Sequence, residues 1–103
     1  MMQTSWNENH AALRGTVDAL PAFSHENHGV AYQVFPLAVP RLSGTVDRLN
    51  VVAARPLLEA CPLSPGDRVE VLGEVRSFNN RTGPGRRLVI TLFARGVAPT
   101  EEG

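Results

Sequence analysis

The chain is notable first for what it lacks. All ten of its basic side chains are arginine, none is lysine, and ten acidic side chains bring the formal net charge to zero. No apolar run approaches the roughly 20 residues of a membrane span, and residues 1–9 lack the basic and apolar regions of a secretory signal. The single cysteine, Cys61, cannot form an internal disulfide. These absences predict a cytoplasmic protein with no membrane contact.

Enzyme signatures are missing as well. The glycines of Gly83-Pro84-Gly85 are not followed by the Lys-Ser of a phosphate-binding loop. No Ser-His-Asp order is recognisable, and the acidic residues are scattered. His25 and His28 have a spacing that tolerates a metal, but a structural zinc site needs four ligands. We therefore expect no enzyme activity, no metal and no cofactor.

What the chain does contain is a patterned segment from Ser64 to Ala98. Residues 68–76 alternate in character with a period of two, as a half-buried strand does. Residues 79–87 then carry three arginines, two glycines and a proline, and residues 88–93 are apolar. Five arginines and no acid lie between Val75 and Val97. A long β-hairpin with an arginine-rich tip is suited to a polyanion, because guanidinium groups match phosphate geometry.

The rest of the chain supplies further strands. Residues 9–20 alternate, with Gly15 predicting a bend or a close neighbouring backbone. A polar loop is expected over 21–29, and strands over 30–41 and 48–55. Pro36 and Pro40 predict that the second strand has an exposed edge or a bulge. Residues 56–61 read as a short helix that begins with proline.

Five strands with a short helix between the third and the fourth predict an all-β protein, a five-stranded OB-fold Greek-key barrel. We expect residues 9–98 to form this single nucleic-acid-binding domain. Residues 1–8 are expected to be a flexible arm, and residues 99–103 a short disordered tail.

Several segments carry a family resemblance: the Leu13-Arg14-Gly15 step, residues 35–39 with Arg41 after them, the Val51-Val52 run, and residues 66–79 with the sequence Gly-Glu-Val-Arg-Ser-Phe-Asn at their end. Over residues 9–97 the chain resembles bacterial single-stranded DNA-binding proteins, to which primosomal replication protein N is related. The resemblance implies an OB-fold that binds unpaired DNA. The chain departs from the housekeeping member at residues 99–103, which have two acids and no terminal aromatic. No tail-mediated recruitment of repair enzymes is therefore expected, and an accessory role is favoured.

Binding of unpaired DNA without sequence preference needs cations along the phosphates and aromatic rings for the bases. Tyr32 is out of phase with the apolar positions of its strand and is favoured as a stacking platform, whereas Phe35 is in phase and expected in the core; Phe93 is ambiguous. Phe23 and Phe78 either stack on bases or pack in a subunit contact. The candidate nucleic-acid contacts are Arg14, Phe23, His25, Tyr32, Arg41, Arg48, Arg76, Phe78, Arg81, Arg86 and Arg87. The interpretation requires arginines that share a surface and are not paired with carboxylates.

Three functions are compatible with this pattern. The first is sequence-independent binding of single-stranded DNA in replication, recombination or repair, by a nucleoid-associated homodimer or homotetramer that covers its exposed strand edges. The alternative, favoured by the zero net charge, is a primosome-type adaptor or another OB-fold protein-interaction module. The third is a fold-only relative that binds RNA or an oligosaccharide.

Overall fold

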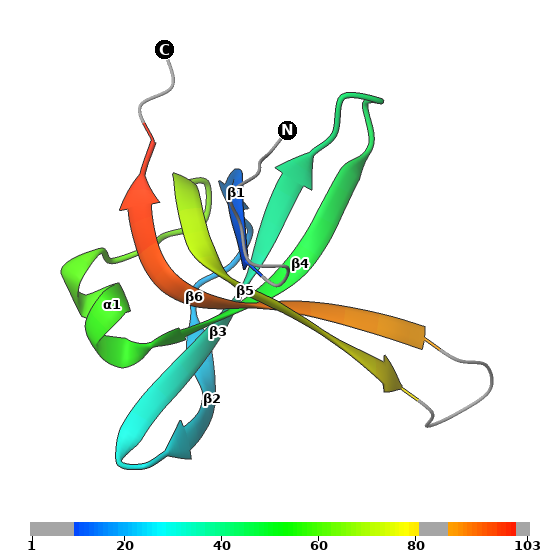
Figure 1. The fold of residues 1–103 in the computed structure, drawn as a ribbon. Helices are drawn as coiled ribbons and strands as arrows, with labels where there is room; N and C mark the ends of the chain where they lie inside the picture. Colours follow the sequence, from blue (N-terminus) through cyan, green and yellow to red (C-terminus); the bar gives the residue numbers. More distant parts are fainter. Residues whose placement is uncertain (1–9, 81–86, 101–103) are drawn as a thin grey trace.

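The computed structural model describes residues 10–80 and 87–100, with the backbone alone described for 77–80 and 87–90. The elements are β1 (His10–Val17), β2 (Ala22–Asn27), β3 (Val30–Pro40), β4 (Val46–Ala54), α1 (Arg55–Ala60), β5 (Arg68–Asn80) and β6 (Arg87–Pro99). Figure 1 shows the strands curling about a common centre, with α1 on one side and the β5–β6 hairpin extending far to the other.

Five of the strands close into a barrel. The sheet order is β1-β5-β6-β4-β3, and β1 pairs back onto β3 through Thr16 with Ala38 and Val17 with Leu37. The pairing of β4 with β6 is parallel, and the other pairings are antiparallel. The helix lies between the third and fourth barrel strands, so the predicted five-stranded OB-fold is confirmed.

The sixth strand, β2, corrects the sequence prediction, which was a polar loop over 21–29. All six residues of β2 are exposed, and the strand pairs only with β3, as an extension outside the barrel. His28 and Gly29 turn the chain between the two strands with φ of 53° and 79°, the left-handed pair that a tight hairpin needs. Because neither face of β2 is buried, its sequence shows no apolar alternation.

Pro36 in β3 also has a different setting from the expected exposed edge or bulge. The strand is central: β4 lies along one side of it, and β2 and β1 share the other. β2 pairs with residues 30–34 and β1 with residues 37 and 38, so Pro36 falls between the two partners. There the missing N–H costs no ladder hydrogen bond, and the Pro36 carbonyl accepts from the Asp18 N–H at 3.0 Å.

Gly15 lies where β1 passes from β5 to β3. A Cβ at this position would overlap the Ala38 carbonyl oxygen, so only glycine permits the approach of the two strands. The predicted close packing at Gly15 is confirmed, and this contact allows the barrel to close.

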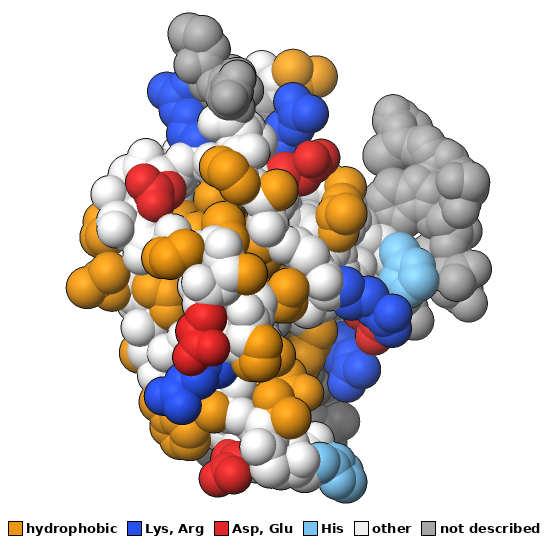
Figure 2. All heavy atoms as spheres, turned by 90° about the vertical axis from the view of Figure 1, so that its left-hand side faces the viewer, with side chains coloured by type: hydrophobic (Ala, Val, Ile, Leu, Met, Phe, Trp, Pro, Cys, Tyr) orange, Lys and Arg blue, Asp and Glu red, His pale blue; other side chains and the backbone are white. Residues whose placement is uncertain are grey.

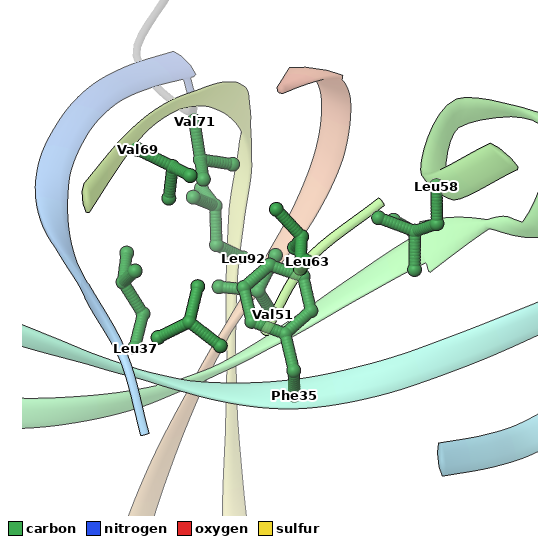
Figure 3. Packing of buried hydrophobic residues seen from close by; sticks show 10 residues of the cluster. Phe35, Leu37, Val51, Leu58, Leu63, Val69, Val71 and Leu92 are labelled. Atoms are coloured by element: carbon green, nitrogen blue, oxygen red, sulfur yellow. The ribbon is translucent and has the colours of Figure 1, made fainter. Parts of the chain in front are cut away.

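The core fills the barrel with alternate residues of its five strands (Figure 3). The largest fully buried side chains are Val17, Phe35, Leu37, Val51, Val69, Val71 and Leu92. Leu58 of α1 and Leu63 after it are buried against the same cluster. Phe35 is 0% exposed, so its predicted core position is confirmed.

At the carboxyl end, β6 includes Pro99, and the Thr100 N–H donates to the Arg68 carbonyl at 3.0 Å. The expected tail therefore begins as ordered strand, while residues 101–103 and the expected arm at 1–8 lie outside the described residues. Within the described residues, no helix is long and apolar enough to cross a membrane.

Candidate nucleic-acid interface

The strand pairing places one continuous row of side chains across the outer face of the sheet. Paired residues on neighbouring strands share a face, and successive pairings connect all six strands from β2 to β1. The row, called the transverse row below, consists of Ala22, Val34, Val52, Phe93, Glu74 and His10. The next inward row, Phe35, Val51, Leu92 and Val75, faces the core. The transverse row therefore lies outside the barrel.

A ring and a guanidinium group form the centre of this face. Phe93 packs beside Val52, which is only 7% exposed although it points outward. The Cζ atom of Arg76 lies 4.6 Å from the centre of the Phe93 ring, a cation–π contact. Phe93, which the sequence left ambiguous, is therefore on the outer face, beside one of the predicted arginines.

A β-bulge positions this group. The register of β5 and β6 shifts between Leu72 and Gly73, which leaves Arg95 as an extra residue on β6. Gly73 is required there, because a Cβ would overlap the carbonyl group of Phe93. The bulge sends the Arg95 side chain toward Glu74.

Glu74 accepts hydrogen bonds from two arginines at once. Arg95 Nη2 donates to Oε2 at 2.7 Å, and Arg76 Nη2 donates to Oε1 at 3.3 Å. His10 Nε2 lies 3.6 Å from Oε2. The hydrogen bond from Arg95, followed by that from Arg76, lowers the pKa of Glu74 below its ordinary value of 4.5, so the carboxylate is charged at neutral pH.

A second aromatic group lies on the same face, two strands away from Phe93 and two residues along the strands. The rings of His25 and Tyr32 stack with centroids 4.9 Å apart and an angle of 6° between their planes. Tyr32 is two residues from Val34 on β3 and so shares the outer face with the transverse row. The His25 Nδ1 atom is also 2.9 Å from the Ser24 hydroxyl oxygen. Two predicted contacts thus form one flat, partly exposed surface.

Phe23 is separated from that pair. It is 66% exposed and pairs with Gln33, which shares the alternate face of β3 with Phe35. The bulge between Phe23 and His25 leaves the two side chains on opposite faces of the hairpin. The structure therefore does not bring Phe23 to the transverse row.

The remaining strand arginines lie elsewhere on the barrel. Arg41 donates from Nε to Asp47 at 2.6 Å, and Arg48 donates from Nε to Asp18 at 2.8 Å. Arg14 lines a shallow pocket of about 400 Å³ with Gly15, Thr16, Pro40, Arg68 and Thr100. Sequence reasoning missed Arg68 and Arg95. The alternation of β5 puts Arg68 on the outer face, so the sequence could have identified it. No local pattern in the sequence distinguishes Arg95.

The interpretation of the sequence required arginines that are not paired with carboxylates. For most of the described arginines this expectation is wrong. Six of the seven with described side chains lie within 4 Å of a carboxylate: Arg14, Arg41, Arg48, Arg55, Arg76 and Arg95. On the face shown in Figure 2, basic side chains stand beside acidic ones and among hydrophobic ones. The pairs are exposed and screened by water, so each contributes little to stability, and a phosphate can replace the carboxylate.

The hairpin tip is the part of the prediction that the structure does not describe. Arg81 and Arg86 lie outside the described residues. Phe78 and Arg87 are in paired strands, opposite Val89 and Asn80, but their side chains are outside the described part. Among the residues that are described, no three His, Cys, Asp or Glu side chains gather to hold a metal ion.

Comparisons with known proteins were made by sequence and by structure. No protein-family model matches the chain, and no curated protein sequence matches it. Among solved structures, the dimeric N-terminal domain of PriB protein from Thermoanaerobacter tencongensis is 38% identical, with a TM-score of 0.76 over 93% of this chain and 100% of that one. This chain belongs to the family of PriB protein.

A second structure supports the shared fold of the PriB family. The small single-stranded DNA-binding protein from Streptomyces coelicolor is 22% identical, with a TM-score of 0.78 over 92% of this chain and 96% of that one. The family resemblance expected from the sequence is confirmed by these matches. The Streptomyces protein is named for binding single-stranded DNA, and neither of the two proteins is named as an enzyme.

Proposed function

We propose that this protein binds single-stranded DNA, largely without sequence preference, on the outer face that carries the transverse row. The observation that carries the proposal is the arrangement of two aromatic groups on one face, the His25–Tyr32 stack and the Phe93 ring with Arg76. Each stacked base gains roughly 1–3 kcal/mol on such platforms, and every base has a flat face to offer. Membership in the PriB family, and the fold shared with a small single-stranded DNA-binding protein, support the same function.

The path proposed for the bound DNA connects the His25–Tyr32 stack with the Phe93 ring. It runs from the β2–β3 hairpin, across β4 and β6, toward the β5–β6 hairpin, which extends beyond the barrel (Figure 1). The arginines of the hairpin tip, Arg81, Arg86 and Arg87, are proposed to contact phosphates at the end of this path. Such binding would serve replication, recombination or repair and would associate the protein with the nucleoid.

The test is a titration of fluorescein-labelled oligo-dT, followed by anisotropy at two salt concentrations. We expect binding that weakens as salt rises, with a slope of about 0.7 per neutralised phosphate. Duplex DNA and RNA of the same length are the controls. No binding of oligo-dT at low salt would refute the proposal, and preference for RNA would redirect it to that polymer.

We also propose that the protein is a homodimer. Residues 10–15 of β1 pair only with β5 among the described residues, so the other edge of the strand is open to a second copy. The domain of PriB protein compared above is itself dimeric. Light scattering at micromolar concentration should give twice the chain mass of 11.1 kDa. A tetramer would add a second interface, and a monomer would contradict the proposal.

A second candidate function is a protein-interaction module of the primosome-adaptor kind. The pairing of the described arginines with carboxylates, together with zero net charge, favours it. This function predicts weak binding of oligo-dT and tight capture of a replication protein by the purified chain. The titration above therefore distinguishes the two candidates.

A further inference from the structure

Glu74 is an acidic residue at the centre of the face on which we place DNA. We propose that its carboxylate is an internal competitor for backbone phosphate, which holds Arg76 and Arg95 until a nucleic acid replaces it, and so limits the affinity of the site. This inference rests on the proposed binding of single-stranded DNA and names the residue that restrains it.

The geometry of the carboxylate resembles the contact that a phosphate would make. Its two oxygens are used separately, Oε2 by Arg95 at 2.7 Å and Oε1 by Arg76 at 3.3 Å. Guanidinium groups bind carboxylate and phosphate through the same pairs of N–H donors. An arginine that donates to Glu74 therefore has fewer donors left for the DNA backbone.

The Phe93 ring is also covered in the free protein. The Arg76 guanidinium lies over the Phe93 ring at 4.6 Å, where a base would otherwise stack. Because Glu74 also binds Arg76, it favours the position that covers the ring. In the free protein the carboxylate thus takes the place of a phosphate, and the guanidinium takes the place of a base.

The charge balance makes this exchange feasible. Two arginines share one glutamate, so the group carries a net charge of +1 when His10 is neutral. The arginine side chains are 55% and 68% exposed, and ion pairs between solvent-exposed groups are weak because water and salt screen them. A polymer that brings several phosphates at once can displace a carboxylate held this weakly.

The experiment compares Glu74→Gln with Glu70→Gln in the intact chain. Glu70 is the matched control, because it is on the same strand and face and pairs with one arginine, Arg14, at 3.6 Å. Both changes remove one negative charge, so they alter the overall field of the protein equally. Affinity for labelled oligo-dT is measured at two salt concentrations, and circular dichroism checks that the fold is retained.

We expect Glu74→Gln to bind oligo-dT about five-fold more tightly and with a steeper salt dependence, whereas Glu70→Gln changes affinity less than about two-fold. Equal effects of the two substitutions, or weaker binding by Glu74→Gln, would overturn the inference and leave the proposed function standing. If neither the unchanged protein nor Glu74→Gln binds oligo-dT, the proposed function fails and the inference fails with it.

Discussion

Arg76 and Arg41 are both exposed arginines paired with a carboxylate, yet their surroundings give them different capacities. Arg41, just after β3, is the one described arginine that pairs with Asp47 of β4, at 2.6 Å. Arg76 shares Glu74 with Arg95 and lies over the Phe93 ring. One pair is electrically neutral, and the other group keeps an unbalanced positive charge beside an aromatic ring. We therefore expect the local excess of cations over carboxylates, and not the number of arginines, to mark the proposed binding surface.

The largest effect is expected from the bulge that builds the Phe93 group. Gly73→Ala should destabilise the protein by about 2–3 kcal/mol, because the added Cβ overlaps the Phe93 carbonyl and the strands must shift. Gly96→Ala is the matched control on the opposing strand, where the only neighbour is a Leu72 carbon at 4.0 Å. Urea unfolding of both variants gives the comparison, and equal losses of stability would show that the bulge is not constrained as described.

The second largest effect is expected from removal of the Phe93 ring. Phe93→Leu keeps apolar packing against Val52 but removes the stacking surface, so binding of oligo-dT should weaken by about 1–3 kcal/mol. Phe23→Leu, on the opposite face of the β2–β3 hairpin, should leave affinity unchanged within about two-fold. Anisotropy titrations measure both affinities. A larger loss from Phe23→Leu would move the interface to the other face.

The two arginines compared above can be tested directly. Arg76→Gln should weaken binding several-fold and lower the salt slope by about 0.7, the value for one lost phosphate contact on single-stranded DNA. Arg41→Gln should change neither quantity appreciably, because its pairing with Asp47 leaves no excess charge. Equal slopes for the two variants would show that the local charge balance does not select the interface.

The smallest effect concerns the pH dependence of stability. Since Arg95, then Arg76, lower the pKa of Glu74 below 4.5, its ion pairs stabilise the folded protein above pH 4.5. That contribution to stability is lost as the pH falls through the folded-state pKa of Glu74. The groups that face the carboxylate are Arg76, Arg95 and His10. The difference in Tm between the unchanged protein and Glu74→Gln should be larger above pH 4.5 than well below it, where the carboxylate is protonated. A difference that does not change with pH would contradict this assignment.

The parts of the molecule that were predictable are those with one buried face. The alternation of β5 and the apolar runs of β1, β3, β4 and β6 predicted five strands, and Phe35 was assigned to the core from its phase. β2 was missed because it has no buried face to generate a pattern. Phe93 was undecided because a ring flanked by apolar neighbours reads the same whether it faces the core or the outside.

The candidate interface depended on register more than on local pattern. Glu74 and Arg95 are 21 residues apart and meet only because a bulge shifts the pairing of β5 and β6. Carboxylates contact most of the described arginines. The zero net charge is compatible with such pairing but does not say which arginine pairs with which carboxylate. Charge counts give totals, whereas pairing depends on which strands are neighbours.

The sequence by itself determined the barrel, because a period of two with alternate apolar residues permits few ways to bury one face of each strand. It also determined the wealth of arginine and predicted a close backbone contact at Gly15, whereas the requirement for glycine at position 73 comes from the pairing of β5 with β6. Only the tertiary structure decided which ring faces outward and which arginines share a carboxylate. Those contacts are set by the stagger of strands distant in sequence, and a shift of one residue would send every side chain to the other face.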